Sequence, residues 1–199
     1  VDDYFQASES GLPSYNLVLV IDTSGSMGWV IGGDGIPGET GEVGSPNRLE
    51  LAKVALINLL NSYQEIADNL NISVIDFGAT VKNTEVNLSV AEAIDHINSL
   101  TASGRTNYTD PLEDAQDILT AQLGSLPDYE QKVYFLSDGY PNAGTAPAGW
   151  QAFVDGEEID VIAVGISIND PDAIAQLDQV GNSTDTTLLI DDPYKLDDA

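Results

Sequence analysis

Three oxygen-bearing side chains follow a short apolar run near the start of the chain. The run, residues 17–21, is rich in β-branched residues and is typical of a strand buried on both faces of a parallel sheet. Asp22, Ser24 and Ser26 come directly after it at every second position, with Gly25 between the serines. A carboxylate and two hydroxyls that converge in one turn are hard ligands, which suit Mg²⁺, Mn²⁺ or Ca²⁺. The pattern therefore indicates a divalent-cation site with positions open for water or a ligand.

The stretch 22–26, Asp-Thr-Ser-Gly-Ser, resembles the Asp-x-Ser-x-Ser signature of von Willebrand factor A domains, which carry a metal-ion-dependent adhesion site (MIDAS). That family adds a threonine from a later loop and an aspartate from the end of a later buried strand. Thr106, in the stretch 103–107, and Asp138, after the apolar stretch 133–136, match these two positions. The resemblance covers nearly the whole chain in the right order. It implies a metal held by Asp22, Ser24, Ser26, Thr106 and Asp138.

The resemblance also implies a role for each ligand. The two serines would coordinate the cation directly, Thr106 directly or through water, and one or both aspartates through bound water. With few direct negative charges the cation stays electron-poor and accepts an acidic side chain of a partner. Asp and Ser after a strand are also common helix caps and turn formers, and for the first motif alone that alternative is favoured. Thr106 and Asp138, at the same edge of the predicted sheet, favour the metal.

The composition bounds the class of protein. The chain has 199 residues, enough for one sizeable domain, with 42% apolar residues and no apolar run of membrane-spanning length, so we expect no membrane insertion. Acidic residues outnumber basic ones 33 to 6, and a net charge of −27 repels phosphate backbones and argues against nucleic acid. A solvated, halophile-like surface is the alternative explanation for most of this charge. Cysteine is absent, which excludes disulfides and thiol chemistry.

Strand-like and helix-like stretches alternate along the chain. Residues 1–15 are interpreted as a polar lead-in and residues 16–199 as a single domain of the von Willebrand factor A kind. Predicted strands cover residues 17–21, 72–77, 80–88, 132–136, 159–164 and 187–190, and predicted helices cover 48–70, 90–100, 111–123, 150–154 and 171–180. We predict an α/β fold, doubly wound and Rossmann-like, whose mostly parallel sheet has one antiparallel edge strand and helices on both faces. Sites in such sheets lie beyond the carboxyl ends of the strands.

A glycine-rich insertion, residues 28–47, separates the metal motif from the first predicted helix. Glycine recurs there at every third position, but five triplets with few prolines are too short for a collagen helix, so a surface loop is predicted. Asp34, Glu39 and Glu42 mark a candidate second cation site in this loop. A merely solvated acidic loop is the alternative, and it is favoured.

Enzymatic readings find little support. His96, the single histidine, lies in a predicted amphipathic helix and is interpreted as an ordinary surface residue, and no Ser-His-Asp arrangement can be assembled near Ser24. The glycine-rich insertion lacks the Gly-Lys-Ser/Thr of a nucleotide-binding loop. Metal-assisted hydrolysis stays open as a minor alternative, although no general base is evident near the motif. We therefore predict that the chain is not an enzyme.

Other residues near the motif have two readings each. Arg105 precedes Thr106 and either receives an acidic ligand or pairs with a nearby acid, of which the second is favoured. Trp29, Tyr108 and Tyr140 form either an aromatic rim around the metal or ordinary packing, and packing is the more common arrangement.

These features predict a divalent-cation-dependent adhesion module that binds a protein or surface ligand through an acidic group at the metal. By resemblance it is a monomeric module of a large extracellular protein at a bacterial surface, similar to calcium-dependent adhesins of the repeats-in-toxin (RTX) kind, although the chain contains no nonapeptide calcium repeat. The alternatives are a structural or assembly module that organises neighbouring domains, and a helper subunit of a metal-chelatase or ATPase complex, which the acidity disfavours. The sequence does not decide between Mg²⁺ and Ca²⁺.

Overall fold

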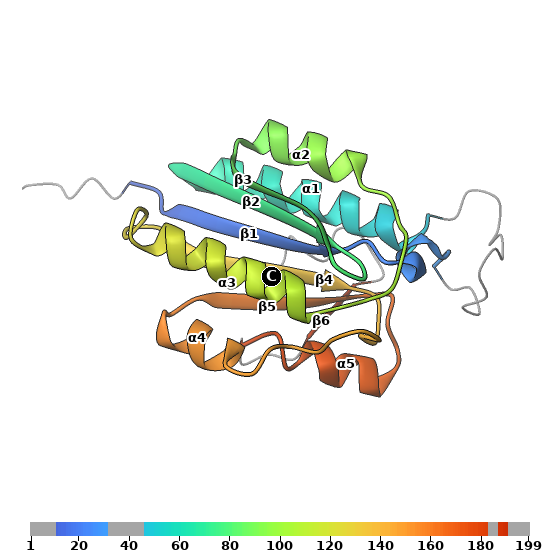
Figure 1. Ribbon diagram of the computed structural model, residues 1–199. Coiled ribbons are helices and arrows are strands. Elements are labelled where there is room, and N and C mark those ends of the chain that lie inside the picture. Colours follow the sequence, from blue (N-terminus) through green and yellow to red (C-terminus); the bar gives the residue numbers. More distant parts are fainter. Residues whose placement is uncertain (1–10, 32–45, 183–186, 191–199) are drawn as a thin grey trace, which may run out of the picture.

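A computed structural model describes residues 11–31, 46–182 and 187–190 (Figure 1). Strands and helices alternate through these residues, as the sequence predicts, except for one pair of consecutive strands and one pair of consecutive α-helices. The strands are β1 (Ser14–Asp22), β2 (Asn69–Phe77), β3 (Val81–Leu88), β4 (Glu130–Ser137), β5 (Asp160–Ile166) and β6 (Leu188–Ile190). The helices are the short 3-10 helix η1 (Gly25–Gly28), α1 (Arg48–Ile66), α2 (Val90–Ser99), α3 (Thr109–Leu123), α4 (Trp150–Gly156) and α5 (Pro171–Leu177).

The strands form one sheet in the order β3-β2-β1-β4-β5-β6. Every neighbouring pair is parallel except β2 and β3, which are antiparallel, so the predicted fold class is confirmed. The mostly exposed β3 is the predicted antiparallel edge strand. The chain runs outward from β1 to β2 on one side and from β4 to β5 on the other. The strand order therefore reverses between β1 and β4, which is where doubly wound folds bind their ligands.

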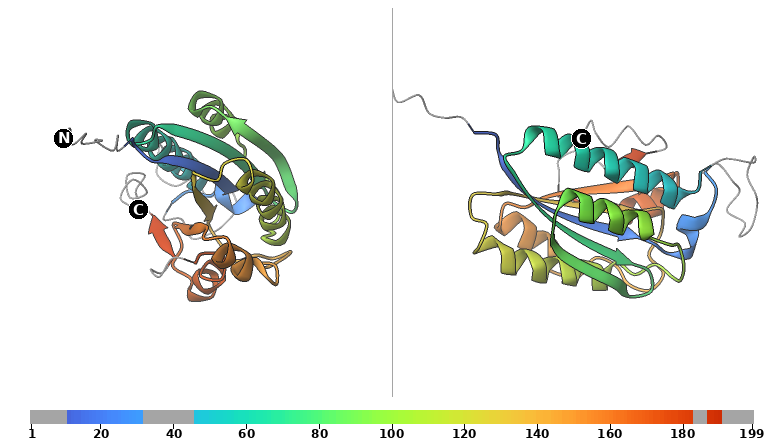
Figure 2. Two further views of the ribbon diagram at one scale, coloured as in Figure 1. Left: turned by 90° about the vertical axis from the view of Figure 1, so that its left-hand side faces the viewer. Right: turned by 90° about the horizontal axis from the view of Figure 1, so that it is seen from above.

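Helices cover both faces of the sheet, with α1 and α2 on one side and α3, α4 and α5 on the other (Figures 1 and 2). Strand β1 lies between the two layers, and its central residues 17–21 are fully buried. Leu17, Leu19 and Ile21 pack toward α1 and α2, while Val18 and Val20 pack toward α3 and α4. Burial on both faces explains why this strand is continuously apolar rather than alternating.

The element boundaries differ from the predicted ones by a few residues. Strand β1 begins at Ser14, because Ser14 and Tyr15 already pair with the start of β2, so the last two residues of the predicted lead-in belong to the sheet. Helix α1 ends at Ile66 and α5 at Leu177, earlier than the apolar pattern indicates. The backbone of Ala67 is extended, which lets β2 begin two residues later.

The two ends of the glycine-rich insertion meet at the base of the loop. Val30 and Asn47 form an antiparallel bridge, and the backbone N–H of Arg48 donates to the carbonyl of Trp29 at 3.0 Å. The Asn47 side chain accepts a hydrogen bond from the backbone N–H of Glu50 at 2.8 Å and so caps α1. This closure sets the first turn of α1 directly beside η1. The predicted second cation site, Asp34, Glu39 and Glu42, lies outside the described residues.

Candidate metal site

The two aspartates of the predicted site lie at the point where the strand order reverses. Asp22 is the last residue of β1, and Asp138 directly follows β4. The two strands are hydrogen-bonded neighbours, with Ile21 opposite Leu136. Both carboxylates are buried, with 0% of Asp22 and 5% of Asp138 exposed. The sheet therefore brings together two acidic residues that are far apart in the sequence.

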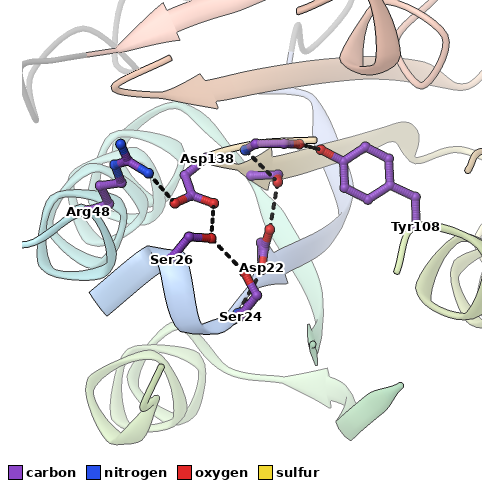
Figure 3. A network of polar contacts seen from close by, with 8 residues as sticks. Asp22, Ser24, Ser26, Arg48, Tyr108 and Asp138 are labelled. Carbon is purple, nitrogen blue, oxygen red and sulfur yellow. Dashed lines mark hydrogen bonds and ion pairs between the residues drawn. The ribbon is translucent and has the colours of Figure 1, made fainter. Parts of the chain in front are cut away.

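A continuous chain of hydrogen bonds joins these aspartates to the two serines (Figure 3). The backbone N–H of Ser24 donates to Asp22 Oδ1 at 2.7 Å, and the hydroxyls of Ser24 and Ser26 lie 3.2 Å apart. The Ser26 hydroxyl donates to Asp138 Oδ1 at 2.9 Å. Ser26 points inward because the backbone after Asp22 turns at once into η1. Four of the five predicted ligands thus form one cluster.

The fifth predicted residue, Thr106, lies on a neighbouring loop that is tied to the motif. The backbone N–H of Ser103 donates to the carbonyl of Thr23 at 2.7 Å, and that of Gly25 donates to the carbonyl of Gly104 at 2.9 Å. Gly104 has a φ of +88°, a conformation that side chains other than glycine disfavour. Thr106 is buried, but within the described residues its hydroxyl makes no hydrogen bond to the other four side chains. The loop therefore lies beside the cluster, but the Thr106 side chain is not hydrogen-bonded to the other four predicted ligands.

Of the two buried carboxylates only that of Asp138 has a basic partner, Arg48, within the described residues; Asp22 accepts hydrogen bonds from the Ser24 backbone and the Ser137 hydroxyl. Burial and, next to it, the negative charge of Asp138 raise the pKa of Asp22 from 3.8 to about 7. Hydrogen bonds from Ser137 and Ser24 act in the opposite direction, because they stabilise the carboxylate. Because Arg48 compensates Asp138 and no basic side chain of the described residues contacts Asp22, a further positive charge beside Asp22 would stabilise the ionised pair.

A family model for the von Willebrand factor type A domain matches residues 16–197. The chain belongs to this family. A search of curated proteins gives no match.

Solved structures with this fold include several surface and matrix proteins. The proximal thread matrix protein 1 of the mussel byssus, solved with a zinc-occupied MIDAS motif, is 16% identical with a TM-score of 0.65, over 94% of this chain and 46% of that chain. The pilus adhesin SpaC from Lactobacillus rhamnosus GG is 18% identical with a TM-score of 0.67, over 94% and 30%. The PilB minor pilin from Streptococcus sanguinis is 18% identical with a TM-score of 0.65, over 95% and 60%. This von Willebrand factor A domain spans less than two thirds of each of these chains.

The residues of this von Willebrand factor A domain fit a divalent cation by their chemistry. The cluster offers two carboxylates and the two serine hydroxyls, with the Thr106 hydroxyl on the adjoining loop, and all are hard oxygen donors. Within the described residues no group of three or more His, Asp or Glu side chains gathers as a metal site would, and the candidate site contains two carboxylates. The raised pKa of Asp22 reflects its burial first and the charge of Asp138 second, and a nearby cation would oppose both effects by stabilising the carboxylate.

Two residues that the sequence reading missed contact the aspartates. The Ser137 hydroxyl donates to Asp22 Oδ2 at 2.6 Å, and Nη1 of Arg48 donates to Asp138 Oδ2 at 2.6 Å (Figure 3). Ser137 immediately precedes Asp138, and this adjacency was a signal available in the sequence. Arg48 lies beyond the glycine-rich insertion, and no spacing rule indicates where such a loop returns.

A third missed residue, Lys82, joins the motif to the Thr106 loop from the start of β3. Its Nζ donates to the carbonyl and hydroxyl of Thr23 at 2.7 and 2.9 Å, and to the carbonyl and hydroxyl of Ser103 at 3.0 and 3.2 Å. Burial lowers the pKa of Lys82, and the nearby charges of Asp76 and Asp22 oppose this. Lys82, on the edge strand β3, therefore links the turn that carries the metal motif to the loop that carries Thr106.

The structure corrects two expectations about residues outside the motif. His96 is not an ordinary surface residue, because its side chain is 15% exposed and its Nε2 lies 3.1 Å from Oδ1 of the buried Asp76. Arg105 pairs with no acid in the part of the chain that the structure describes. Its Nε donates to the Asn142 side-chain oxygen at 3.2 Å, and its Nη2 donates to the Asn142 carbonyl at 3.1 Å.

The three aromatic residues do not form a common rim. Tyr108 is fully buried against Phe77 and Phe135, and its hydroxyl donates to the carbonyl of Gly139 at 2.5 Å. Tyr140 is 55% exposed, and Trp29 lies under the guanidinium of Arg48. Packing is therefore the correct reading for Tyr108, whose hydroxyl points toward the chain that follows Asp138 (Figure 3).

Proposed function

We propose that this domain is a divalent-cation-dependent adhesion module. Asp22, Ser24, Ser26, Thr106 and Asp138 would hold Mg²⁺, Ca²⁺ or Mn²⁺. When bound, the cation supplies a positive charge that accepts an acidic group of a protein or surface ligand. The serines offer neutral oxygen ligands. The aspartates supply the negative charge that attracts the cation, and hydrogen bonds to Ser24 and Ser26 keep their carboxylates beside the serine hydroxyls.

The convergence of Asp22 and Asp138 with the two motif serines carries this proposal. These side chains come from two neighbouring strand ends and one turn, and they share one hydrogen-bond chain. Arg48 offsets the charge of Asp138, but within the described residues no basic side chain contacts Asp22, so burial would make the ionised pair costly in a domain without a bound cation. The MIDAS named in the byssus protein structure supports the same reading.

The positions of the basic residues support an acidic partner. The chain has six Lys and Arg residues at a net charge of −27. Three of them lie around the site. Arg48 contacts Asp138, Lys82 bonds to Thr23 in the motif, and Arg105 is next to Thr106 in the chain. A negatively charged group approaching elsewhere meets a surface of its own sign, whereas this edge repels it least.

The setting proposed is a bacterial cell surface, as a monomeric module of a larger secreted protein. The pilus adhesin and the minor pilin among the similar folds support this setting. No helix among the described residues is long and apolar enough to cross a membrane. An RTX-type adhesin remains the more specific form of the proposal and rests on the acidity and the lack of cysteine.

A structural or assembly module is the second candidate. The similar folds include a byssal matrix protein and a minor pilin, whose names point to assembly rather than to capture of a ligand. In that case the cation would stabilise the domain without accepting an outside group. The two candidates differ in whether a coordination position is open.

Calorimetric titration tests the cation. The chelator-stripped domain is titrated with Mg²⁺ and with Ca²⁺ in about 150 mM salt. At this ionic strength the Debye length is about 8 Å, so the attraction of cations to the acidic surface is largely screened. Asp22→Ala and Asp138→Ala should each abolish one binding event. Asp160→Ala removes an acid at the opposite end of the sheet, where Asp160 pairs with Lys132, and should leave that event intact. Equal loss in all three variants, or none, would contradict a cation at the motif.

Water relaxation tests the acceptance of an acidic group. Domain loaded with Mn²⁺ should enhance the relaxation of solvent water, because an open position exchanges water. Acetate should reduce this enhancement in the wild type by displacing that water. If the Mn²⁺-loaded domain is stable but acetate has no effect, the adhesion mechanism is wrong and the structural role is supported.

A further inference from the structure

Four asparagines of the chain stand in the tripeptide Asn-x-Ser/Thr, which is the acceptor signal for an N-linked glycan in exported proteins. They are Asn71, Asn87, Asn107 and Asn182. A glycan is attached to the side-chain amide nitrogen, so this nitrogen has to be accessible and free of bonds that the fold needs. The structure therefore distinguishes between the four asparagines, which the sequence alone does not.

Three of these asparagines use their amide nitrogen inside the fold. Nδ2 of Asn71 donates to Oδ1 of the fully buried Asn16 at 2.8 Å. Asn107 is only 7% exposed, and its Nδ2 donates to the carbonyl of Ala79 at 3.1 Å. Nδ2 of Asn182 donates at 2.8 Å to the backbone carbonyl that precedes β5. A sugar at any of these nitrogens would break a bond that joins separate parts of the fold.

Asn87 differs from the other three because it lies in a β-bulge of the exposed edge strand β3. Between two successive pairs of the ladder, β3 has Val86 and Asn87 where β2 has Ser73 alone. The backbone of Asn87 has a φ of +55°, a left-handed conformation that asparagine adopts more readily than most residues. Asn87 is exposed to solvent. The bulge therefore takes this asparagine out of the regular ladder and presents it at the surface.

The residues around Asn87 complete an acceptor signal of the bacterial kind. Bacterial oligosaccharyltransferases require, besides the tripeptide, an acidic side chain two residues before the asparagine. Glu85 stands at this place, and it is exposed, as is Ser89, the hydroxyl residue of the tripeptide. The Ser89 hydroxyl also donates to Glu92 in the first turn of α2, a place where helices fray. At the other three asparagines the preceding place holds Asn69, Arg105 and Val180.

The place of Asn87 in the fold leaves room for a bulky group. Lys82, which contacts the metal motif, lies at the start of β3, whereas Asn87 lies near the other end of the same strand (Figure 1). A glycan at Asn87 would therefore leave the candidate metal site open to a partner. It would also cover part of an edge strand that exposes Val86, and covered edges do not pair with the strands of other chains.

We propose that Asn87 is the acceptor of an N-linked glycan, which a bacterial oligosaccharyltransferase transfers from a lipid-linked oligosaccharide. In this step Nδ2 of Asn87 forms a bond to the anomeric carbon of the first sugar and loses a proton. The bond between that carbon and the lipid diphosphate breaks, and the lipid diphosphate leaves with the bonding electrons. The inference needs export of the chain but no cation at the motif, so its failure would leave the proposed cation site untouched.

Transfer of a glycan to the folded domain tests this proposal. The purified domain is incubated with bacterial membranes that contain an oligosaccharyltransferase and its lipid-linked oligosaccharide, and mass spectrometry of the intact chain measures the gain in mass. We expect the wild type to gain the mass of one oligosaccharide, which peptide sequencing should place on Asn87. Asn87→Gln and Glu85→Gln should each abolish the gain. Glu113→Gln is the matched control, because it removes the same charge from an exposed position of α3 and should be modified like the wild type.

Three outcomes would overturn the proposal. The first is a wild-type domain that gains no mass, and the second is a gain that persists in Asn87→Gln, since the glycan would then be on another residue. The third is a gain that persists in Glu85→Gln, because the acceptor would then lack the signal of the bacterial enzyme. Circular dichroism of each variant before incubation checks that the fold is retained, so that a lost gain in mass is not the result of unfolding.

Discussion

The Ser137 hydroxyl donates to Asp22 Oδ2 at 2.6 Å, and the next residue along the chain is Asp138. The end of β4 thus acts on Asp22 in two opposing ways. The hydroxyl stabilises the carboxylate, while burial and, next to it, the charge of Asp138 disfavour ionisation, and the net effect is a pKa of about 7 for Asp22. A buried acid with a raised pKa links the stability of the cation-free domain, and its affinity for a cation, to pH.

The cation-free domain should lose stability as the pH rises from about 4 to about 7. In this window Asp22 is protonated in the folded chain, with a pKa of about 7, but ionised in the unfolded chain, with a pKa near 3.8. The folded state therefore binds more protons, and its free energy of unfolding falls by up to about 1.4 kcal/mol per pH unit from this group. Urea unfolding of wild type and Asp22→Asn isolates the effect, because the variant lacks the group. A stability difference that does not grow with pH up to 7 would refute it.

Cation binding should release a proton below pH 7. The protonated Asp22 must ionise before the site can hold a divalent cation, so the affinity should rise with pH and level off above about 8. Titrations at pH 6 in two buffers of different ionisation enthalpy count the protons released, and we expect close to one per cation. At pH 8.5 the two buffers should give the same heat. Buffer-independent heat at pH 6 would mean that Asp22 is already ionised without metal.

The architecture of the domain followed from the sequence because its signals are local. The apolar run 17–21 and the helical periods between the strands fix a doubly wound sheet, and the carboxyl ends of its strands then bring Asp22 and Asp138 together. Contacts that cross the fold left no such signal. Arg48 reaches Asp138 only because the insertion closes at Val30 and Asn47, and periodicity says nothing about that closure.

The sequence also did not indicate the partners of side chains on the polar faces of helices and strands. The helical periodicity of the sequence predicts that His96 is exposed. Its helix α2, however, packs on the face of the sheet where β2 carries the buried Asp76, and the two side chains meet. Lys82 reads as one of the outward residues of an edge strand, yet its long side chain turns over the motif loop. A long or ionisable side chain can satisfy either water or a distant partner, and the sequence alone does not show which one it meets.

Lys82→Met should loosen the site more than it disturbs the rest of the fold. The variant keeps much of the apolar stem but loses the bonds from Nζ to Thr23 and Ser103. One charged hydrogen bond contributes about 1.5–3 kcal/mol, and because Lys82 is exposed we expect a total loss near the low end of this range. Lys132→Met is the matched control, because Lys132 pairs with the half-exposed Asp160 and should cost less than about 1 kcal/mol. Urea unfolding of the cation-free proteins gives both values. Equal costs would mean that Lys82 is not a structural link between the two loops.

Asn16→Leu should destabilise the fold without changing the cation site. Asn16 is fully buried at the amino end of β1, where its Nδ2 donates to the side chains of Gln122 at 3.0 Å and Gln131 at 2.6 Å. A leucine leaves these buried amide oxygens without that donor, at a cost of about 3 kcal/mol. Asn69→Leu is the control, because Asn69 is exposed and its side chain, among the described residues, bonds to Ser14 alone, so its loss should cost under about 1 kcal/mol. Asn16 lies at the end of β1 opposite to Asp22, so the affinity for Mg²⁺ in the folded variant should equal that of the wild type. A weakened cation site in this variant would show that the polar network and the metal site are coupled through the strand.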